Sequence, residues 1–323
     1  THADKKLNPD QTSHPDNVPY EYRLSTYEYE LPADLVAQEP ANHRDESRLM
    51  VVDRDKSLIS HYSFRDLPNL LRETDVLILN ETGVIPVLIK GHKPTGGSVE
   101  LLVLNPAIQN EFAVSAKGTI RECLVKTSKP LRTGADIFID ENTHLSVFQA
   151  IRPGRALIEF PCHSGELLDF LRIFGRTPLP PYIKHKEESE PKHQSRYQTI
   201  YSRTPGSVAA PTAGLHFTDE LLREVEDRGV KIGKVTLHVG LGTFMPMRGM
   251  DIRRHKMETE FFDIPEQTAD LINSAIRSGH RVVAVGSTSL RSLESAAKDN
   301  RSIMFGSQYT DLFIKPGYKF KIV

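Results

Sequence analysis

Short runs of Val, Ile and Leu, cut repeatedly by Gly and Pro, fill residues 84–159 and leave no stretch there with a useful helical period. The runs read VIPVLIKG, SVELLVLN, FAVSAKG, ECLVKTS, ADIFID, LSVFQAI and ALIEF. Apolar stretches of this length, separated by turn residues, are typical of the strands of a small β-barrel or a sandwich. We therefore expect a separate small β-barrel domain over residues 84–159, inserted into the rest of the chain.

The residues on either side of this insert show the alternating pattern of an α/β protein. Strands are predicted at Leu49–Asp53, Leu58–Phe64, Asp75–Asn80, Val230–Leu237 and Val282–Val285, and helices at Arg65–Leu71, Ser164–Phe174, Thr218–Arg228, Pro265–Ser278 and Ser289–Lys298. Such alternation indicates a parallel sheet or an α/β-barrel-like main domain. This main α/β domain is expected to be discontinuous and to comprise residues 25–83 and 160–323. Residues 1–24 are predicted to be a polar, poorly ordered N-terminal arm.

Charge balance and cysteine content limit the function classes. The 323-residue chain has 41 Lys+Arg against 42 Asp+Glu, a net charge of -1 with neutral His. This balance excludes a binder that relies on a large excess of one charge. The two cysteines, Cys123 and Cys162, form neither a CxxC motif nor a disulfide framework, which favours a reducing, cytoplasmic compartment. A single Cys123–Cys162 bridge is the minor alternative.

The sequence contains no recognisable membrane span or secretory signal. No apolar run approaches the roughly 20 residues that a membrane span needs, and the N-terminal stretch lacks the apolar core of a secretory signal. We therefore expect a cytoplasmic protein with no membrane partner. The sequence begins without Met and stops in a strand-like stretch, Tyr318–Val323, so we expect it to be shorter than the gene product.

Three loops rich in Gly, Thr and Ser join strands to helices in the C-terminal half. They are Gly206–Phe217 (GSVAAPTAGLHF), Leu237–Pro246 (LHVGLGTFMP) and Val285–Glu294 (VGSTSLRSLE). Ligands of α/β proteins bind beyond the carboxyl ends of the strands, where small residues and helix N-termini let a ligand approach the backbone. A single loop of this kind would be read as a tight turn. Three together predict a pocket.

Several other sites receive little support. Gly240 and Gly242 lack the third glycine of a dinucleotide fingerprint, no phosphate-binding GxxxxGK[ST] motif occurs, and Ser289 is not in a GxSxG elbow. His216 and His238 lie in two of the three loops and are candidates for proton transfer, with a hydrogen-bonded structural imidazole as the alternative for each. The histidines form no HxxxH or HxH pair, so no metal site is expected.

Positive charge gathers in the inserted β domain. Residues 115–134 contain Lys117, Arg121, Lys126, Lys129 and Arg132 against Glu122 alone. A basic face on a small barrel is a common way to bind a nucleic-acid backbone. The alternative is a solvated edge whose lysines prevent strand pairing between molecules.

Long segments of the chain resemble one family closely. They run in the family's order from about Tyr29 to the end: YELPADLVAQEP, RDESRLMVVDR, DVLILNETGVIP, GGSVELLVL, LVKTSKPLRTGADI, TPLPPYI, YQTIYSRTPGSVAAPTAGLHFT, VTLHVGLGTFMPM, AVGSTSLRSLESAA and DLFIKPGYKFKIV. The run around PTAGLHF is long and specific. The chain resembles the S-adenosylmethionine:tRNA ribosyltransferase-isomerases of queuosine biosynthesis, the QueA family.

The resemblance implies a fold and a reaction. Family members combine an α/β-barrel-like domain with an inserted β-barrel. They transfer and isomerise the ribosyl part of S-adenosylmethionine onto 7-aminomethyl-7-deazaguanine at the wobble position of tRNA, which gives epoxyqueuosine-tRNA, adenine and methionine. S-adenosylmethionine is then a consumed substrate, with no tightly bound cofactor and no metal. The expected partners are this tRNA and S-adenosylmethionine, and a monomer is expected.

The resemblance also suggests roles for particular residues. A proton-transfer group is needed beside the sulfonium, and His216 is the first candidate, with His238 second. A second group would line the S-adenosylmethionine pocket or hold its polar groups: Thr212, Gly214, Gly240, Gly242, Thr243, Phe244, Thr288, Ser289 and Arg291, the last as a carboxylate fork. The tRNA backbone would meet Lys126, Lys129 and Arg132. Because the chain has no Trp, stacking on the target base would fall first to Phe217, Phe244 or Tyr182.

Four positions depart from the family pattern: Gly83, Leu88, Met245 and Glu258. The first two replace basic residues, and Glu258 replaces the second histidine of an His-x-Met-His motif. A relative that binds RNA without catalysing the reaction is therefore the main alternative. A methyltransferase that uses S-adenosylmethionine is a third reading, but no glycine-rich strand–loop–helix occurs early in the chain.

Overall fold

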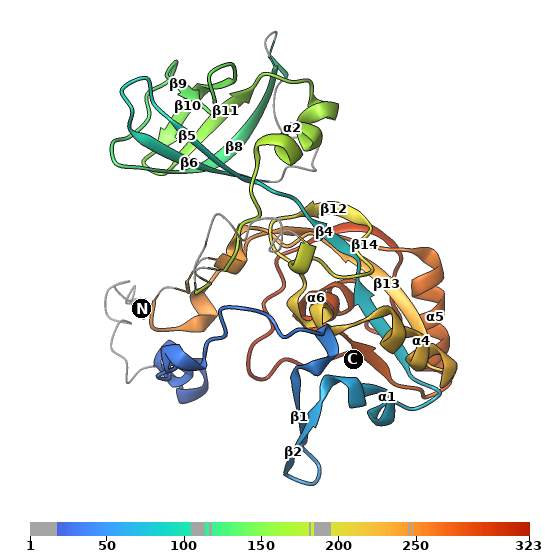
Figure 1. Cartoon of the computed structure of the whole chain (residues 1–323). Coiled ribbons are helices and arrows are strands. Elements are labelled where there is room, and N and C mark those ends of the chain that lie inside the picture. Colours follow the sequence, from blue (N-terminus) through green and yellow to red (C-terminus); the bar gives the residue numbers. More distant parts are fainter. Residues whose placement is uncertain are drawn as a thin grey trace, which may run out of the picture.

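A small β-barrel stands beside a larger α/β body in the computed structural model (Figure 1). The structure describes residues 18–104, 114–115, 118–180, 182–183, 195–244, 246–247 and 249–323. Short 3₁₀ turns supplement the regular elements at Tyr20–Tyr22, Leu24–Tyr27, Ala33–Leu35, Arg44–Glu46, Phe64–Asp66, Ser164–Glu166, Thr212–His216, Leu241–Phe244 and Ile252–Arg254. The expected mixed α/β fold with an inserted barrel is confirmed.

The barrel consists of six antiparallel strands that close on themselves. They are β5 (Leu88–His92), β6 (Ser98–Val103), β8 (Gly118–Thr127), β9 (Asp136–Phe138), β10 (His144–Arg152) and β11 (Arg155–Phe160), and the short β7 (Val114–Ser115) pairs with β8. Pairing of β11 with β8 closes the ring, which decides for the barrel over the sandwich. Alternate residues of β6, Val99, Leu101 and Val103, are buried in its core, as the period-2 pattern of a strand requires.

Helix α2 (Leu167–Phe174) covers the barrel core. Its buried residues Leu167, Phe170 and Leu171 belong to the same apolar cluster as the barrel strands. Just before α2 begins, the Glu166 carboxylate accepts a hydrogen bond from the His163 backbone N–H (2.9 Å). The predicted domain boundary at residue 160 therefore assigns α2 to the α/β domain, although α2 packs against the barrel.

The larger body is built on a five-stranded sheet. Its order is β15 (Val282–Ala284), β3 (Val76–Asn80), β13 (Lys231–Leu237), β14 (Glu260–Ile264) and β16 (Gly306–Thr310). The pairs β15–β3 and β3–β13 are parallel, and β13–β14 and β14–β16 are antiparallel. The carboxyl ends of the three parallel strands consequently meet at one edge of the sheet.

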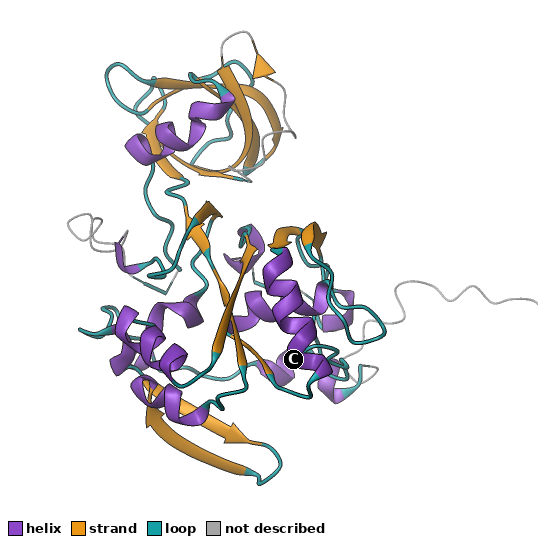
Figure 2. Ribbon diagram, turned by 90° about the vertical axis from the view of Figure 1, so that its right-hand side faces the viewer, coloured by secondary structure: helices purple, strands orange, loops and turns teal. Residues whose placement is uncertain are grey.

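Strand β3, between β15 and β13, is buried on both faces, and helices cover each side of the sheet (Figure 2). Val76 and Ile78 pack with residues of α5 (Glu266–Arg277) and α6 (Gly286–Ser295). Leu77 and Leu79 pack with α4 (Asp219–Asp227), and the short α1 (Leu67–Leu70) joins the same cluster. Helix α4 begins as expected, because the Thr218 side chain accepts a hydrogen bond from the Leu221 N–H (3.1 Å).

A parallel pair of short strands, β4 (Thr82–Val84) and β12 (Thr204–Ser207), continues from the α/β body toward the barrel. The Gln198 side chain bonds both the N–H and the C=O of Val84 (3.0 and 2.8 Å). These two hydrogen bonds hold the backbone in place just before β5, where the chain enters the barrel.

Residues 18–24 correct the expectation of a poorly ordered arm. The Leu24 N–H donates to the Met250 carbonyl (2.9 Å), and Val18 is 5% exposed. Residues 1–17 of the predicted arm lie outside the described residues. The hairpin of β1 (Arg48–Asp53) and β2 (Leu58–Ser63) projects from the body at the end opposite the barrel (Figure 1).

Cys123 and Cys162 are free thiols, so the alternative of a disulfide between them is wrong. Within the described ranges, no helix has both the length and the apolar character needed to cross a membrane. The same ranges hold no cluster of three or more His, Cys, Asp or Glu residues arranged for a metal ion.

Candidate active site

The three small-residue loops surround one cavity of about 610 Å³. Thr212 and Ala213 come from the first loop, Val239 and Thr243 from the second, and the start of α6 supplies the third. The complete described lining is Pro180, Tyr182, Tyr197, Ala210, Pro211, Thr212, Ala213, Val239, Thr243, Pro246, Gly286, Ser287 and Thr288. The cavity lies where β12, β13 and β15 end, which is the edge of an α/β sheet that receives ligands.

A second cavity of about 380 Å³ adjoins the first. The two share Pro180, Tyr182, Tyr197 and Thr212. The remaining described lining of the smaller cavity is Ala37, Gln38, Glu39, Pro40, Leu179, Ile183, Arg196, Leu215 and His216. The two cavities are therefore contiguous, with the shared residues at their boundary.

His216 ends the 3₁₀ turn Thr212–His216 and faces the smaller cavity. Its ring lies 5.1 Å from the Phe64 ring. The Arg44 side chain donates to the neighbouring Leu215 carbonyl (3.0 Å). Burial lowers the pKa of His216, a hydrogen bond to the Arg44 backbone opposes this, and the Arg44 charge lowers it further. At neutral pH the imidazole is thus uncharged and able to accept a proton.

His238 lies behind the cavity wall. Its Nδ1 atom is 2.8 Å from the Thr82 hydroxyl oxygen, and its ring stacks on Phe261 with centroids 5.5 Å apart. Burial lowers its pKa to about 4. A Cβ added at Gly206 would overlap this ring. His238 is not among the described lining residues of the two cavities. Its neutral ring instead connects β4, through Thr82, to the loop after β13.

The predicted glycines have packing reasons that are visible in the structure. A Cβ at Gly214 would overlap the buried hydroxyl of Tyr201 and approach Thr199. At Gly240 and Gly242 an added Cβ would meet Glu260 and Glu258 instead. Gly214 and Gly242 therefore let their loops pack closely on neighbouring side chains, whereas a Cβ at Gly240 would make only ordinary contact. The threonines at 212, 243 and 288 line the larger cavity.

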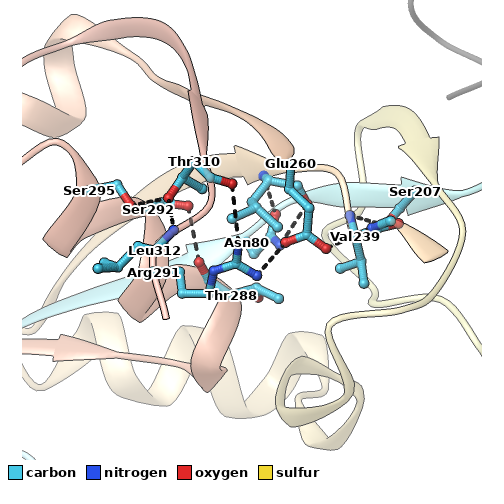
Figure 3. A network of polar contacts seen from close by, with 12 residues as sticks. Asn80, Ser207, Val239, Glu260, Thr288, Arg291, Ser292, Ser295, Thr310 and Leu312 are labelled. Atoms are coloured by element: carbon cyan, nitrogen blue, oxygen red, sulfur yellow. Dashed lines mark hydrogen bonds and ion pairs between the residues drawn. The ribbon is translucent and has the colours of Figure 1, made fainter. Parts of the chain in front are cut away.

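Arg291, predicted to hold the carboxylate of the substrate, is paired inside the protein. Its Nη1 atom donates to Glu260 Oε2 (2.6 Å), and its Nη2 atom to the Thr310 carbonyl (3.4 Å), as Figure 3 shows. Glu260 Oε1 accepts from the Gly240 N–H (2.8 Å). Helix α6 also begins at Gly286 instead of Ser289, which turns Arg291 away from the cavity and leaves Ser289 fully buried.

The remaining polar contacts in this region tie the loops together (Figure 3). Ser207 Oγ bonds both the Val239 N–H (2.8 Å) and the Ala209 carbonyl (2.8 Å). Thr288 contributes its carbonyl to Ser292 within α6 (3.0 Å). Its own hydroxyl is buried and has no partner among the described atoms. Thr288 lines the larger cavity with its other atoms, because this hydroxyl is itself covered.

Sequence reasoning missed several residues that shape the site. Thr82, Gly206 and Glu260 hold its loops, and Tyr197 and Ser287 line the larger cavity. Gly206 and Ser287 lie inside two of the three predicted small-residue loops, so their residue type and their position in the sequence could have identified them. The pairing of Glu260 with Arg291 joins residues far apart in the chain and gave no such signal. The Phe244 side chain lies outside the described residues.

Three of the four positions that depart from the family pattern can be placed. Gly83 lines a cavity of about 290 Å³ beside β4, and Leu88 begins the first barrel strand. Glu258 is exposed next to Gly242. Met245 lies outside the described residues. None of the three described positions lines either of the two adjoining cavities.

The basic residues of the barrel divide into buried and exposed members. Arg121 is only 2% exposed and belongs to the interior, and Lys117 lies outside the described residues. Lys126 is exposed but paired with Glu100 (3.2 Å). Lys129 and Arg132 are exposed, and the Lys93 side chain bonds the Lys129 carbonyl. Lys93 therefore joins the predicted set at the end of β5 and β8 away from the α/β body.

Comparisons with known proteins agree with these features. The chain is 43% identical over 303 residues to the S-adenosylmethionine:tRNA ribosyltransferase-isomerase of Acetivibrio thermocellus, which covers 93% of this chain and 85% of that relative. The enzyme of the same name from Symbiobacterium thermophilum is 44% identical over 305 residues, with the same coverage.

A crystal structure of S-adenosylmethionine tRNA ribosyltransferase from Thermotoga maritima is similar at 28% identity, with a TM-score of 0.43, 92% coverage of this chain and 81% of that one. The family described as "Queuosine biosynthesis protein" matches residues 24–323, which include both cavities and the barrel. On this match and the identities to its relatives, the chain belongs to the queuosine biosynthesis protein family.

Proposed function

We propose that the protein is a S-adenosylmethionine:tRNA ribosyltransferase-isomerase, a transferase of queuosine biosynthesis. It transfers and isomerises the ribosyl part of S-adenosylmethionine onto 7-aminomethyl-7-deazaguanine at the tRNA wobble position, and releases adenine and methionine. The observation that carries the proposal is the pair of adjoining cavities, with a neutral histidine on the wall of one of them. A reaction between two bound molecules needs such contiguous sites.

His216 is the proposed proton-transfer residue. In the proposed sequence, a base removes a proton from the carbon beside the sulfonium and adenine is expelled. The amine of the modified base then bonds to the rearranged sugar, and methionine leaves when the carbon–sulfur bond breaks. The lowered pKa of His216 keeps the imidazole ready to accept that proton at neutral pH. His238, buried on Thr82 and Phe261, supports the loops instead of acting as a second base.

The larger cavity is the proposed site of S-adenosylmethionine. Thr212, Thr243 and Ser287 line it with exposed side chains that offer hydroxyls to the sugar and amino-acid parts of the substrate, and the first N–H groups of α6 favour its carboxylate. Arg291 contributes indirectly, because its pair with Glu260 holds the Gly240 backbone. S-adenosylmethionine is consumed, and the reaction calls for no tightly bound cofactor.

The exposed basic residues at the outer end of the barrel, Lys126, Lys129 and Arg132, are the proposed contacts to the tRNA backbone. Such contacts position an RNA without reading its sequence. The protein is proposed to act as a monomer in the cytoplasm, where its tRNA substrate is found.

Product analysis tests the proposal. The purified chain is incubated with S-adenosylmethionine and tRNA that carries the modified base, and the products are identified by mass spectrometry. Adenine, methionine and a tRNA heavier by the ribosyl unit are expected. Binding of tRNA without release of adenine supports the non-catalytic alternative, and formation of S-adenosylhomocysteine identifies a methyltransferase.

A further inference from the structure

The smaller cavity has the chemistry of a site for a flat heteroaromatic ring. Leu179, Ile183 and Leu215 supply apolar walls, and two aromatic rings, Tyr182 and Tyr197, stand where it joins the larger cavity. Aromatic side chains bind unpaired bases by stacking on their faces. Tyr182 is 60% exposed, so its ring is open to a base that arrives from solvent.

The walls of this cavity are fixed before any ligand binds. Arg196 donates to the carbonyls of Asn42 (3.1 Å) and Ala41 (2.6 Å), and Arg44 donates to the Leu215 carbonyl (3.0 Å). The Gln38 side chain donates to the Tyr182 carbonyl (3.0 Å). Three segments that are distant in the sequence are thus fastened to one another around the cavity. A rigid, preformed pocket loses little entropy when it binds a rigid base.

The two cavities differ in what they offer. Only the larger one has the start of α6 and the exposed side chains of Thr243 and Ser287, which suit the carboxylate and hydroxyls of S-adenosylmethionine. The smaller one is more apolar and carries His216 on its wall. A base bound there would place its aminomethyl group toward the shared residues Tyr182 and Thr212, beyond which the sugar of the other substrate lies.

We infer that the smaller cavity binds the modified 7-deazaguanine base of the tRNA, turned out of the anticodon loop and stacked on Tyr182, while S-adenosylmethionine occupies the larger cavity. This assignment rests on the proposed function. The base enters past the exposed side of Tyr182, and the sugar of S-adenosylmethionine extends past the shared Thr212 toward His216, at the other end of the same turn. Turning a base out of its stack is how enzymes that act on bases reach them, and it is cheapest in a single-stranded loop.

Two matched substitutions separate the cavities. Ala37 lines only the smaller one and Ser287 only the larger one, and both are exposed, so a bulky side chain at either position obstructs its cavity without disturbing the core. Ala37→Trp is expected to raise the KM for an anticodon stem-loop carrying the modified base by about tenfold or more, with the Kd for S-adenosylmethionine unchanged. Ser287→Trp is expected to weaken S-adenosylmethionine and leave binding of the stem-loop unchanged.

The measurements are the KM for the stem-loop, from release of adenine, and the Kd for S-adenosylmethionine, from isothermal titration. The reverse pattern, or an Ala37→Trp variant with an unchanged KM for the stem-loop, overturns the assignment while the proposed function stands. A wild-type chain that releases no adenine overturns the proposed function itself, and the base assignment falls with it.

Discussion

His216 is the residue on which the proposed chemistry depends. It combines a lowered pKa with a place on the wall of the smaller cavity, whereas the other loop histidine, His238, is half-buried against Thr82 and Phe261 and lines neither cavity. Composition and spacing found both histidines but did not distinguish them, because burial and ring partners come from segments distant in the chain. Two residues contact the His238 ring: Thr82 is 156 positions away in the sequence, and Phe261 lies in a separate strand.

Removal of the His216 imidazole should therefore slow the reaction without releasing the tRNA. We expect His216→Ala to lower kcat by about 10²- to 10⁴-fold, the usual contribution of general acid–base catalysis. The Kd for modified tRNA, from filter binding, should stay near the wild-type value. His61→Ala, in the projecting hairpin, serves as the control. Unchanged turnover in His216→Ala would show that another group moves the proton.

The buried state of His238 has a consequence for stability. Its pKa falls from 6.5 to about 4 on folding because burial disfavours the charged ring. The unfolded chain binds a proton here at higher pH, so the stability that the neutral ring supports is complete above pH 6.5 and is lost toward pH 4. The loss amounts to about 3 kcal/mol.

Urea unfolding of the wild type and of His238→Gln at pH 7 and pH 4.5 measures this effect. The free energy of unfolding should fall further in the wild type, because the variant has no imidazole to protonate. An equal fall in both proteins would mean that His238 titrates near its ordinary pKa in the folded state.

At the scale of elements, most helices and strands follow from sequence pattern. Helix α4 (Asp219–Asp227) differs by one residue at each end from the predicted Thr218–Arg228, and α5 (Glu266–Arg277) by one residue at each end from the predicted Pro265–Ser278. Helix α6 starts three residues earlier than expected, because Gly286 adopts a positive φ of 82° that lets the chain turn directly from β15 into the helix. That early start changes which side chains of the loop face the cavity.

The pair formed by Glu260 and Arg291 links α6 to β14 and to the loop after β13. Both side chains are largely buried, at 5% and 13% exposure, so loss of one partner leaves an uncompensated charge. We expect Arg291→Met to lower the free energy of unfolding by about 3–5 kcal/mol. The double variant Glu260→Leu/Arg291→Met should recover a large part of that loss.

A double-mutant cycle in urea tests this coupling, and the Kd for S-adenosylmethionine gives a second readout. Because Glu260 also holds the Gly240 N–H, both variants should weaken S-adenosylmethionine even where stability is recovered. Strictly additive effects on the free energy of unfolding would contradict the pair.

For the whole molecule, the sequence indicated an inserted β module but left a barrel and a sandwich open. The choice depends on the pairing of β8 with β11, which lie far apart in the chain and whose register no local pattern encodes. The near-zero net charge likewise conceals how charge is distributed. Arg121 is inside the barrel, while Lys129 and Arg132 are outside at its far end.

This distribution predicts how tRNA binding depends on salt. Each phosphate contact that is lost lowers the slope of log Kobs against log salt by about 1, so Lys129→Ala/Arg132→Ala should weaken tRNA binding at low salt and flatten that slope. Lys56→Ala is the control, since this lysine is also exposed but belongs to the hairpin at the opposite end of the molecule (Figure 1). Fluorescence titrations over a range of salt concentrations give the slopes. A loss of affinity that does not vary with salt would assign these residues to another role, whereas a flatter slope with unchanged kcat at saturating tRNA would place the barrel in docking and leave the chemistry to the two cavities.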